Sequence, residues 1–288
     1  MSSPLLRLTP ERGRPFDRAR QNRRGGVRLG MARVSEIGVP CAILIIALVA
    51  AFGLGGTSRG DAGQLLLLRP ISMLLLGCAL CVVRPADVRA YAGPYVLVIA
   101  LAGLIGMQLI PLPFSLWRQL PDRALIVEID RVAGLGEIAR PLTLSPSATW
   151  NALWSLGLPI AVFVLATGLT AAGRRRILLL LLGLGAASAI WATLQLLGPS
   201  DGPLYLYRWN STGLPNGLFA NRNHHAVFLA CLIPTAWVVL GQWTDPRSHH
   251  AIVRSMFAVW VALQFIVILL TGSRAGMLTA VLASGSLF

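Results

Sequence analysis

The sequence predicts an all-α membrane protein, a polytopic bundle of transmembrane helices. Hydrophobic residues make up 55% of the 288 residues and charged residues only 12%, a balance that excludes an ordinary soluble domain. The mean hydropathy of +0.69 indicates the same class. Because the basic residues lie between long apolar runs, we assign the net charge of +14 to the ends of membrane spans, and expect no nucleic-acid partner.

Seven apolar runs approach the roughly 20 residues that a helix needs to cross the hydrocarbon core. They lie near 38–56, 65–83, 91–110, 151–171, 177–198, 224–241 and 252–271. An eighth run begins after Arg274 and stops at Phe288, which is too short for a complete span. The sequence therefore predicts about eight spans, of which the last is incomplete.

Residues 1–35 differ from the rest of the chain. They hold nine arginines together with proline and glycine, and they show almost no periodic apolar pattern. This composition predicts a disordered cytoplasmic tail, most of which would be lost if translation began at Met31 instead of Met1. The remaining residues, 36–288, form the predicted transmembrane domain.

The distribution of arginines sets the orientation. With the N-terminus inside, sixteen arginines fall on the cytoplasmic side and nine on the other, and three of the inside clusters occupy very short connections. The expected localisation is a bacterial inner membrane crossed several times, with loops 111–150 and 199–223 in the periplasm. Membrane lipids are then obligatory partners.

Loop 111–150 carries its own structural signals. Ser145 before Pro146 predicts a helix start, with proline at the first helical position. Apolar residues interrupted by charges predict an amphipathic helix at the membrane interface. Those apolar residues are Trp117, Leu120, Leu125, Ile126 and Ile129.

Two polar clusters stand out among the apolar runs. Asn221, Arg222, Asn223 and His224 precede the sixth run, and a shorter cluster containing Ser273 and Arg274 separates the seventh from the eighth. The predicted topology places both at the periplasmic ends of spans, where they can line one anionic site. The planar fork of arginine suits phosphate oxygens, and His224 could act as a base near neutral pH. Snorkelling arginines and a structural histidine cap are the alternatives.

Other features narrow the chemistry. All eleven acids lie in the tail, in loops or at span ends, whereas ion-coupled transporters usually need a carboxylate inside the membrane. No outside pair of closely spaced aspartates could hold a divalent metal over a phosphate, so we expect neither metal nor other cofactor. Arg59 and Arg69 also face outward, and each could snorkel to the interface or join the site.

The polar clusters resemble those of the O-antigen ligase and polymerase superfamily. The resemblance rests on Gly217-x-Phe219-x-Asn221-Arg222-Asn223-His224-x-Ala226, followed by Ser273-Arg274-x-Gly276. The Pro111-Leu-Pro and Pro141-Leu-Thr-Leu-Ser-Pro borders of the predicted loop are also similar. His225 departs from the family, which usually has a large apolar residue at that position. Members also carry a large periplasmic loop further downstream.

The resemblance implies a glycosyltransferase that transfers or polymerises glycan from undecaprenyl pyrophosphate at the periplasmic face, in lipopolysaccharide or other polysaccharide biosynthesis. The acceptor would be lipid A–core or another glycan. His224, Arg222 and Arg274 would then be catalytic, and substrate would be bound by Asn221, Asn223, Ser273, Arg59 and Arg69. Two alternatives remain open: a bicarbonate-type transport protein, and a truncated fragment that binds lipid carrier without catalysis.

Overall fold

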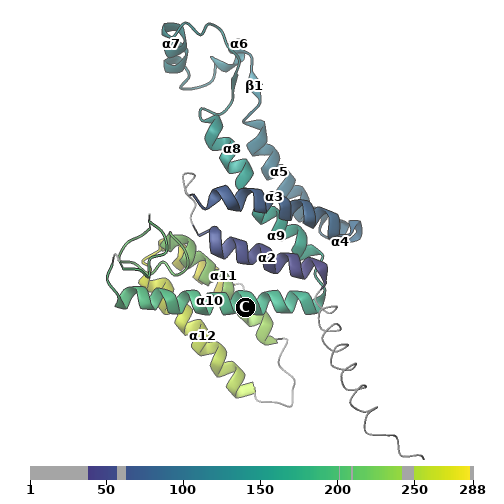
Figure 1. The fold of residues 1–288 in the computed structure, drawn as a ribbon, viewed down its shortest axis with the longest axis vertical. Helices are drawn as coiled ribbons and strands as arrows, with labels where there is room; N and C mark the ends of the chain where they lie inside the picture. Colours follow the sequence, from purple (N-terminus) through teal and green to yellow (C-terminus); the bar gives the residue numbers. More distant parts are fainter. Residues whose placement is uncertain (1–37, 57–62, 201, 209, 242–249, 286–288) are drawn as a thin grey trace, which may run out of the picture. The chain divides into compact units, whose positions relative to one another are not determined.

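The computed structural model describes residues 38–56, 63–200, 202–208, 210–241 and 250–285. The chain divides into two compact units, Met1–Gly38 and Val39–Phe288, and the described residues belong almost entirely to the second. The tail predicted over 1–35 lies outside the described residues. The structure is 73% helix and 2% strand, which confirms the all-α prediction (Figure 1).

Each of the predicted apolar runs is helical, and the fourth is divided between two helices. The helices of the apolar runs are α2 (Val39–Leu54), α3 (Leu65–Val82), α5 (Ala92–Met107), α8 (Pro146–Ser155) with α9 (Gly157–Thr167), α10 (Ala171–Leu197), α11 (Arg222–Gly241), α12 (His250–Leu270) and α13 (Arg274–Gly285). Within the described part, three segments are long and apolar enough to cross a membrane: Leu65–Val82, Pro146–Thr167 and Ala171–Leu197. Val39–Leu54, Ala92–Met107 and Arg254–Leu270 are apolar but shorter.

Two helix starts follow from local sequence signals. Helix α8 begins at Pro146 after Ser145, as the sequence predicts, although the Ser145 hydroxyl makes no capping hydrogen bond. Helix α10 begins six residues before the predicted apolar span, because the Thr170 hydroxyl accepts a hydrogen bond from the Gly173 amide at 3.1 Å. The run Arg174–Arg176 therefore forms part of its first two turns.

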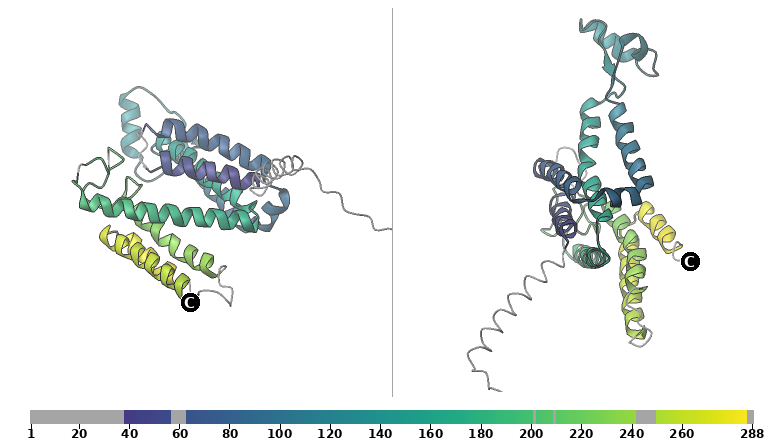
Figure 2. Two further views of the ribbon diagram at one scale, coloured as in Figure 1. Left: turned by 60° about the horizontal axis from the view of Figure 1, so that its bottom comes forward. Right: turned by 90° about the vertical axis from the view of Figure 1, so that its right-hand side faces the viewer.

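Two hydrophobic clusters form the core, and α10 contributes to both. The first cluster gathers buried residues of α2, α3 and α9 with Ile177 near the start of α10. The second gathers residues of α11, α12 and α13 with Ala189 and Ala192 near the end of α10. Figure 2 shows α10 between these two groups of helices. Its final turns thus lie against the element that carries the first polar cluster.

Contacts between helix ends define two ends of the described bundle. At the end where α11 starts, the Ala220 amide donates to the Gly56 carbonyl just after α2, at 2.8 Å. At the other end, a side chain at Gly168, after α9, would contact Pro40 in the first turn of α2 and Val83 after α3. We call these the motif end and the opposite end. Arg84 and Arg89, between α3 and α5, and Arg174, near the start of α10, belong to the opposite end.

Residues 111–145 fold into a small unit instead of one interfacial helix. Strands β1 (Pro111–Leu112) and β2 (Arg140–Pro141) pair antiparallel, and two separate short helices lie between them, α6 (Phe114–Trp117) and α7 (Ala124–Val132). The prediction of one amphipathic helix that includes Trp117 and Leu120 is therefore wrong. Helix α7 alone keeps an exposed apolar stripe, formed by Leu125, Ile129 and Val132.

The prediction fails because Trp117 makes contacts with residues far from it in the sequence. Its ring is buried with the Arg123 guanidinium 5.0 Å from its centre and that of Arg140 at 6.0 Å. The indole nitrogen donates to the Pro141 carbonyl at 2.9 Å, and Arg140 also pairs with Asp130. Because these contacts bury Trp117, it is withdrawn from any membrane surface.

Candidate functional site

The side chain of one glutamine of α10, Gln195, holds the loop before α11 through hydrogen bonds. The carbonyl oxygen of Gln195 accepts hydrogen bonds from the backbone amides of Asn216 and Gly217, both at 2.9 Å. Its amide nitrogen donates to the carbonyls of Leu204 at 2.9 Å and Gly217 at 3.1 Å. Gln195 is 2% exposed, so these four bonds form in a region from which water is excluded.

Gly217 is the point of closest approach between this loop and the helices. Its φ of +59° lies in the left-handed region, which glycine adopts without strain. A side chain here would place its Cβ 2.6 Å from Nε2 of His225 and closer still to Oγ of Ser188. The next amide, of Leu218, donates to that Ser188 hydroxyl at 3.1 Å. The loop therefore lies directly on α10 and α11.

His225 has a packing position inside this arrangement. The side chain is fully buried, its Nδ1 lies 3.1 Å from the Pro215 carbonyl oxygen, and its ring stacks on Phe219 with centroids 5.8 Å apart. Phe219 in turn contacts the rings of Phe52 and Phe228. An imidazole suits this place because it fills the aromatic cluster and also bonds a loop carbonyl. These contacts give His225 a structural role in holding the loop against α11.

Residues near Gly56 attach the same loop to the end of α2. The Tyr207 ring lies where a Cβ of Gly56 would be, so only glycine leaves room for the ring. Burial raises the pKa of the Tyr207 phenol, and a hydrogen bond with the Gly56 backbone opposes that shift in part. Together with the bond between Ala220 and Gly56, this contact joins the first core cluster to the start of α11.

The starts of α11 and α13 lie side by side. A Cβ at Gly276 would overlap the Cβ of Ala226, so the two helices approach each other closely near their first turns. The Asn221 side chain accepts from the Asn223 amide at 2.8 Å, and the Ser273 hydroxyl accepts from the Gly276 amide at 3.0 Å. Each start is thus capped by a residue of the predicted clusters, and both positive helix-dipole ends meet at the motif end.

A direct contact joins the two clusters across 49 positions of sequence. Nη1 of Arg222 donates to the carbonyl oxygen of Thr271 at 3.1 Å, and the buried Thr271 hydroxyl accepts from the Ser273 amide. The guanidinium also lies 3.5 Å from where a Cβ of Gly272 would be, and Gly272 has a φ of +61°. Among the described residues, the bond to Thr271 is the one hydrogen bond of the Arg222 guanidinium, which has five N–H donors.

The remaining predicted site residues differ in exposure. His224, Asn223 and Arg274 are exposed at the motif end, whereas Asn221 and Arg222 are partly buried and Ser273 is 1% exposed. Because the Ser273 hydroxyl caps α13, its contacts give it a structural role, and its assignment to a substrate site stays a prediction. Arg59 lies outside the described residues. Neither Arg222 nor Arg274 forms an ion pair with a described acid.

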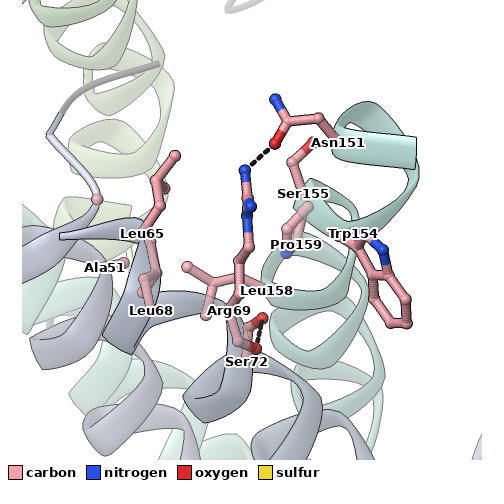
Figure 3. A pocket seen from close by; sticks show the side chains of 11 residues that line it. Ala51, Leu65, Leu68, Arg69, Ser72, Asn151, Trp154, Ser155, Leu158 and Pro159 are labelled. Carbon is pink, nitrogen blue, oxygen red and sulfur yellow. Dashed lines mark hydrogen bonds between the residues drawn. The ribbon is translucent and has the colours of Figure 1, made fainter. Parts of the chain in front are cut away.

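Arg69 lies at a separate cavity. Its guanidinium donates to the Asn151 side chain and extends from α3 toward α8 (Figure 3). The cavity has a volume of about 290 Å³ and is lined by parts of α2, α3, α8 and α9. None of the residues of the two polar clusters lines it. The structure thus brings Arg222 together with the Ser273 cluster but places Arg69 elsewhere.

Sequence reasoning missed the two residues of α10 that hold the loop, Gln195 and Ser188. A signal for them was present, since they are seven positions apart and therefore share one face of α10. Polar residues on one face of an apolar helix mark a buried polar contact. No group of His, Cys, Asp and Glu that could hold a metal occurs in the described part of the chain.

A scan against protein-family models gave no match for this chain, and neither did comparisons with curated proteins and with solved structures. The resemblance to the O-antigen ligase superfamily therefore rests on the motif residues themselves.

Proposed function

We propose that this chain is part of an inner-membrane glycosyltransferase of the O-antigen ligase and polymerase type. The observation that supports the proposal most is the contact between Arg222 and Thr271, which brings the two motif clusters to one place. Arg222 supplies N–H donors that have no partner among the described residues, Arg274 adds a second exposed cation, and two helix starts point at the same region. A pyrophosphate of a lipid-linked glycan is a ligand that matches this concentration of positive charge.

In the proposed reaction, a hydroxyl of the glycan acceptor attacks the anomeric carbon of the lipid-linked sugar. The new carbon–oxygen bond forms as the bond from that carbon to the pyrophosphate oxygen breaks. Arg222 and Arg274 stabilise the negative charge on the departing undecaprenyl pyrophosphate. His224, which is exposed and lies two residues after Arg222, accepts the proton of the attacking hydroxyl. Asn221 and Asn223 would orient the phosphate and sugar oxygens around these groups.

The proposal includes eight spans with the N-terminus in the cytoplasm. The contacts of Gly56 and Gly168 support this topology, because α2 begins at the opposite end and finishes at the motif end, while α3 and α9 both finish at the opposite end. Arg84, Arg89 and Arg174, which lie near the opposite end, are typical of a cytoplasmic face. The motif end would then face the periplasm, where lipid-linked glycans are used.

Cysteine labelling tests this topology. In a variant without the native cysteines, Thr212→Cys should react with a membrane-impermeant maleimide applied to intact spheroplasts, because Thr212 is exposed at the motif end. Arg175→Cys, exposed at the opposite end, should react only after the membrane is permeabilised. The reversed labelling pattern would overturn the orientation and, with it, access of the site to periplasmic glycan.

A genetic experiment tests the function itself. Deleting the gene should change the length or attachment of surface polysaccharide while bicarbonate and ion uptake stay normal. Restoring the wild-type gene should correct the polysaccharide, whereas the Arg222→Lys/Arg274→Lys double variant, expressed at the same level, should not. Normal polysaccharide combined with impaired uptake would instead support the transport function.

A further inference from the structure

The cavity at Arg69 combines one cation with apolar walls. Arg69 is the fifth residue of α3, so its charge begins about one turn inside an apolar helix. Ala51, Leu65, Leu68 and Leu158 supply the apolar lining. The polar lining consists of Arg69, Asn151, Ser72 and Ser155. The cavity volume of about 290 Å³ is near the lower end of the range for small-molecule sites, roughly 300–1,000 Å³.

The contacts of Arg69 leave it able to bind an anion. Nη2 donates to the Asn151 carbonyl oxygen, and Arg69 forms no ion pair with any described acid. The amide nitrogen of Asn151 points away from this bond (Figure 3). A guanidinium and an amide held together in this way offer several N–H donors close together, and such donors suit phosphate oxygens.

Two tryptophans lie on the outer side of the same arginine. Trp150 and Trp154 stack with ring centroids 6.2 Å apart, and both are about half exposed. They line an open depression that also includes Arg69 and Asn151. Tryptophans concentrate at the level of lipid headgroups, because their rings are apolar while their N–H groups need a polar partner. Arg69 therefore lies between an apolar cavity and a surface typical of the headgroup region.

We propose that this cavity binds an amphiphile that carries a phosphate group, with the phosphate on Arg69 and Asn151 and the apolar chain along Leu65, Leu68 and Leu158. It is a second site for anionic lipid, distinct from the one formed by Arg222 and Arg274, and it does not depend on the proposed enzymatic function. A membrane phospholipid and a polyprenyl phosphate share this chemistry. Occupancy at this site stabilises the contact between α3 and the α8–α9 segment.

Native mass spectrometry of the full chain in neutral detergent tests the proposal. The probes are phosphatidylglycerol, undecaprenyl phosphate and, as a lipid without phosphate, diacylglycerol. The wild type should retain at least one phosphate-bearing lipid more strongly than diacylglycerol, and the tighter of the two identifies the source. Arg69→Gln should weaken that binding about tenfold or more, because a charge-assisted hydrogen bond is lost.

Three further variants sharpen the test. Ser155→Phe should also weaken binding, because its ring would fill part of the cavity while Arg69 stays intact. Arg118→Gln should leave binding unchanged, since Arg118 is exposed and lies over the Phe114 ring outside the cavity. Arg222→Lys/Arg274→Lys should retain the phosphatidylglycerol adduct. Equal retention of all three lipids, or unchanged binding in Arg69→Gln, would overturn the proposal.

Discussion

Replacing Gly217 with alanine should destabilise the protein by about 2–5 kcal/mol. A left-handed conformation costs a non-glycine residue about 1–2 kcal/mol, and forcing a methyl group into a packed region costs about 1–3 kcal/mol more. Both costs apply here, because the φ is +59° and the added Cβ would collide with Ser188 and His225. The measurement is the free energy of unfolding in a neutral detergent.

Gly213 offers a matched control in the same loop. Its φ is +74°, but the nearest atom to an added Cβ is Cβ of Ser200 at an ordinary 3.7 Å. Gly213→Ala should therefore show only the conformational cost of about 1–2 kcal/mol. Equal destabilisation by the two substitutions would mean that the loop does not lie against Ser188 and His225 as described.

Substituting Gln195 with leucine should have an effect of similar size, about 3–5 kcal/mol. The change keeps the volume of the side chain but removes every hydrogen bond that Gln195 makes to the loop. The amides of Asn216 and Gly217 would then be buried without a partner, and each such group costs about 1–3 kcal/mol. The Leu204 carbonyl would lose only one of its two side-chain hydrogen bonds, because it keeps the bond from Trp191.

Gln119 provides the comparison for this substitution. It is exposed, and its amide bonds only the Ser115 carbonyl four residues earlier. Gln119→Leu should change the free energy of unfolding by no more than about 0.5 kcal/mol. If Gln195→Leu behaved like Gln119→Leu in thermal unfolding, the loop would have to be held by contacts other than this glutamine.

Much of the fold follows from the sequence because apolar runs are local signals. Helices occur where the runs predicted them, and Pro146 opens α8 as its position after Ser145 indicates. The meeting of Arg222 with the Ser273 cluster could also be anticipated. Successive helices reverse direction, so the starts of α11 and α13 fall at the same end of the bundle.

Other features could not be predicted because they depend on partners far apart in sequence. Trp117 has an apolar side chain among charges, which locally resembles an interfacial residue, but Arg123 and Arg140 enclose it. Gln195 could be recognised as buried and polar, whereas its partners come from a loop whose backbone path the residue pattern does not define. The cavity at Arg69 likewise depends on Asn151, which is 82 positions away.

The central claim is that Arg222 and Arg274 hold one pyrophosphate together, and binding of an undecaprenyl-pyrophosphate analogue to the purified protein tests it most directly. Arg222→Lys and Arg274→Lys should each weaken binding about tenfold or more, because lysine keeps the charge but loses the planar fork. Arg89→Lys, at the opposite end, is the control and should bind normally. If the two arginines share the ligand, the double variant should lose less binding free energy than the sum of the single losses. Unchanged affinity in both single variants would contradict the shared site and leave these arginines as interfacial residues.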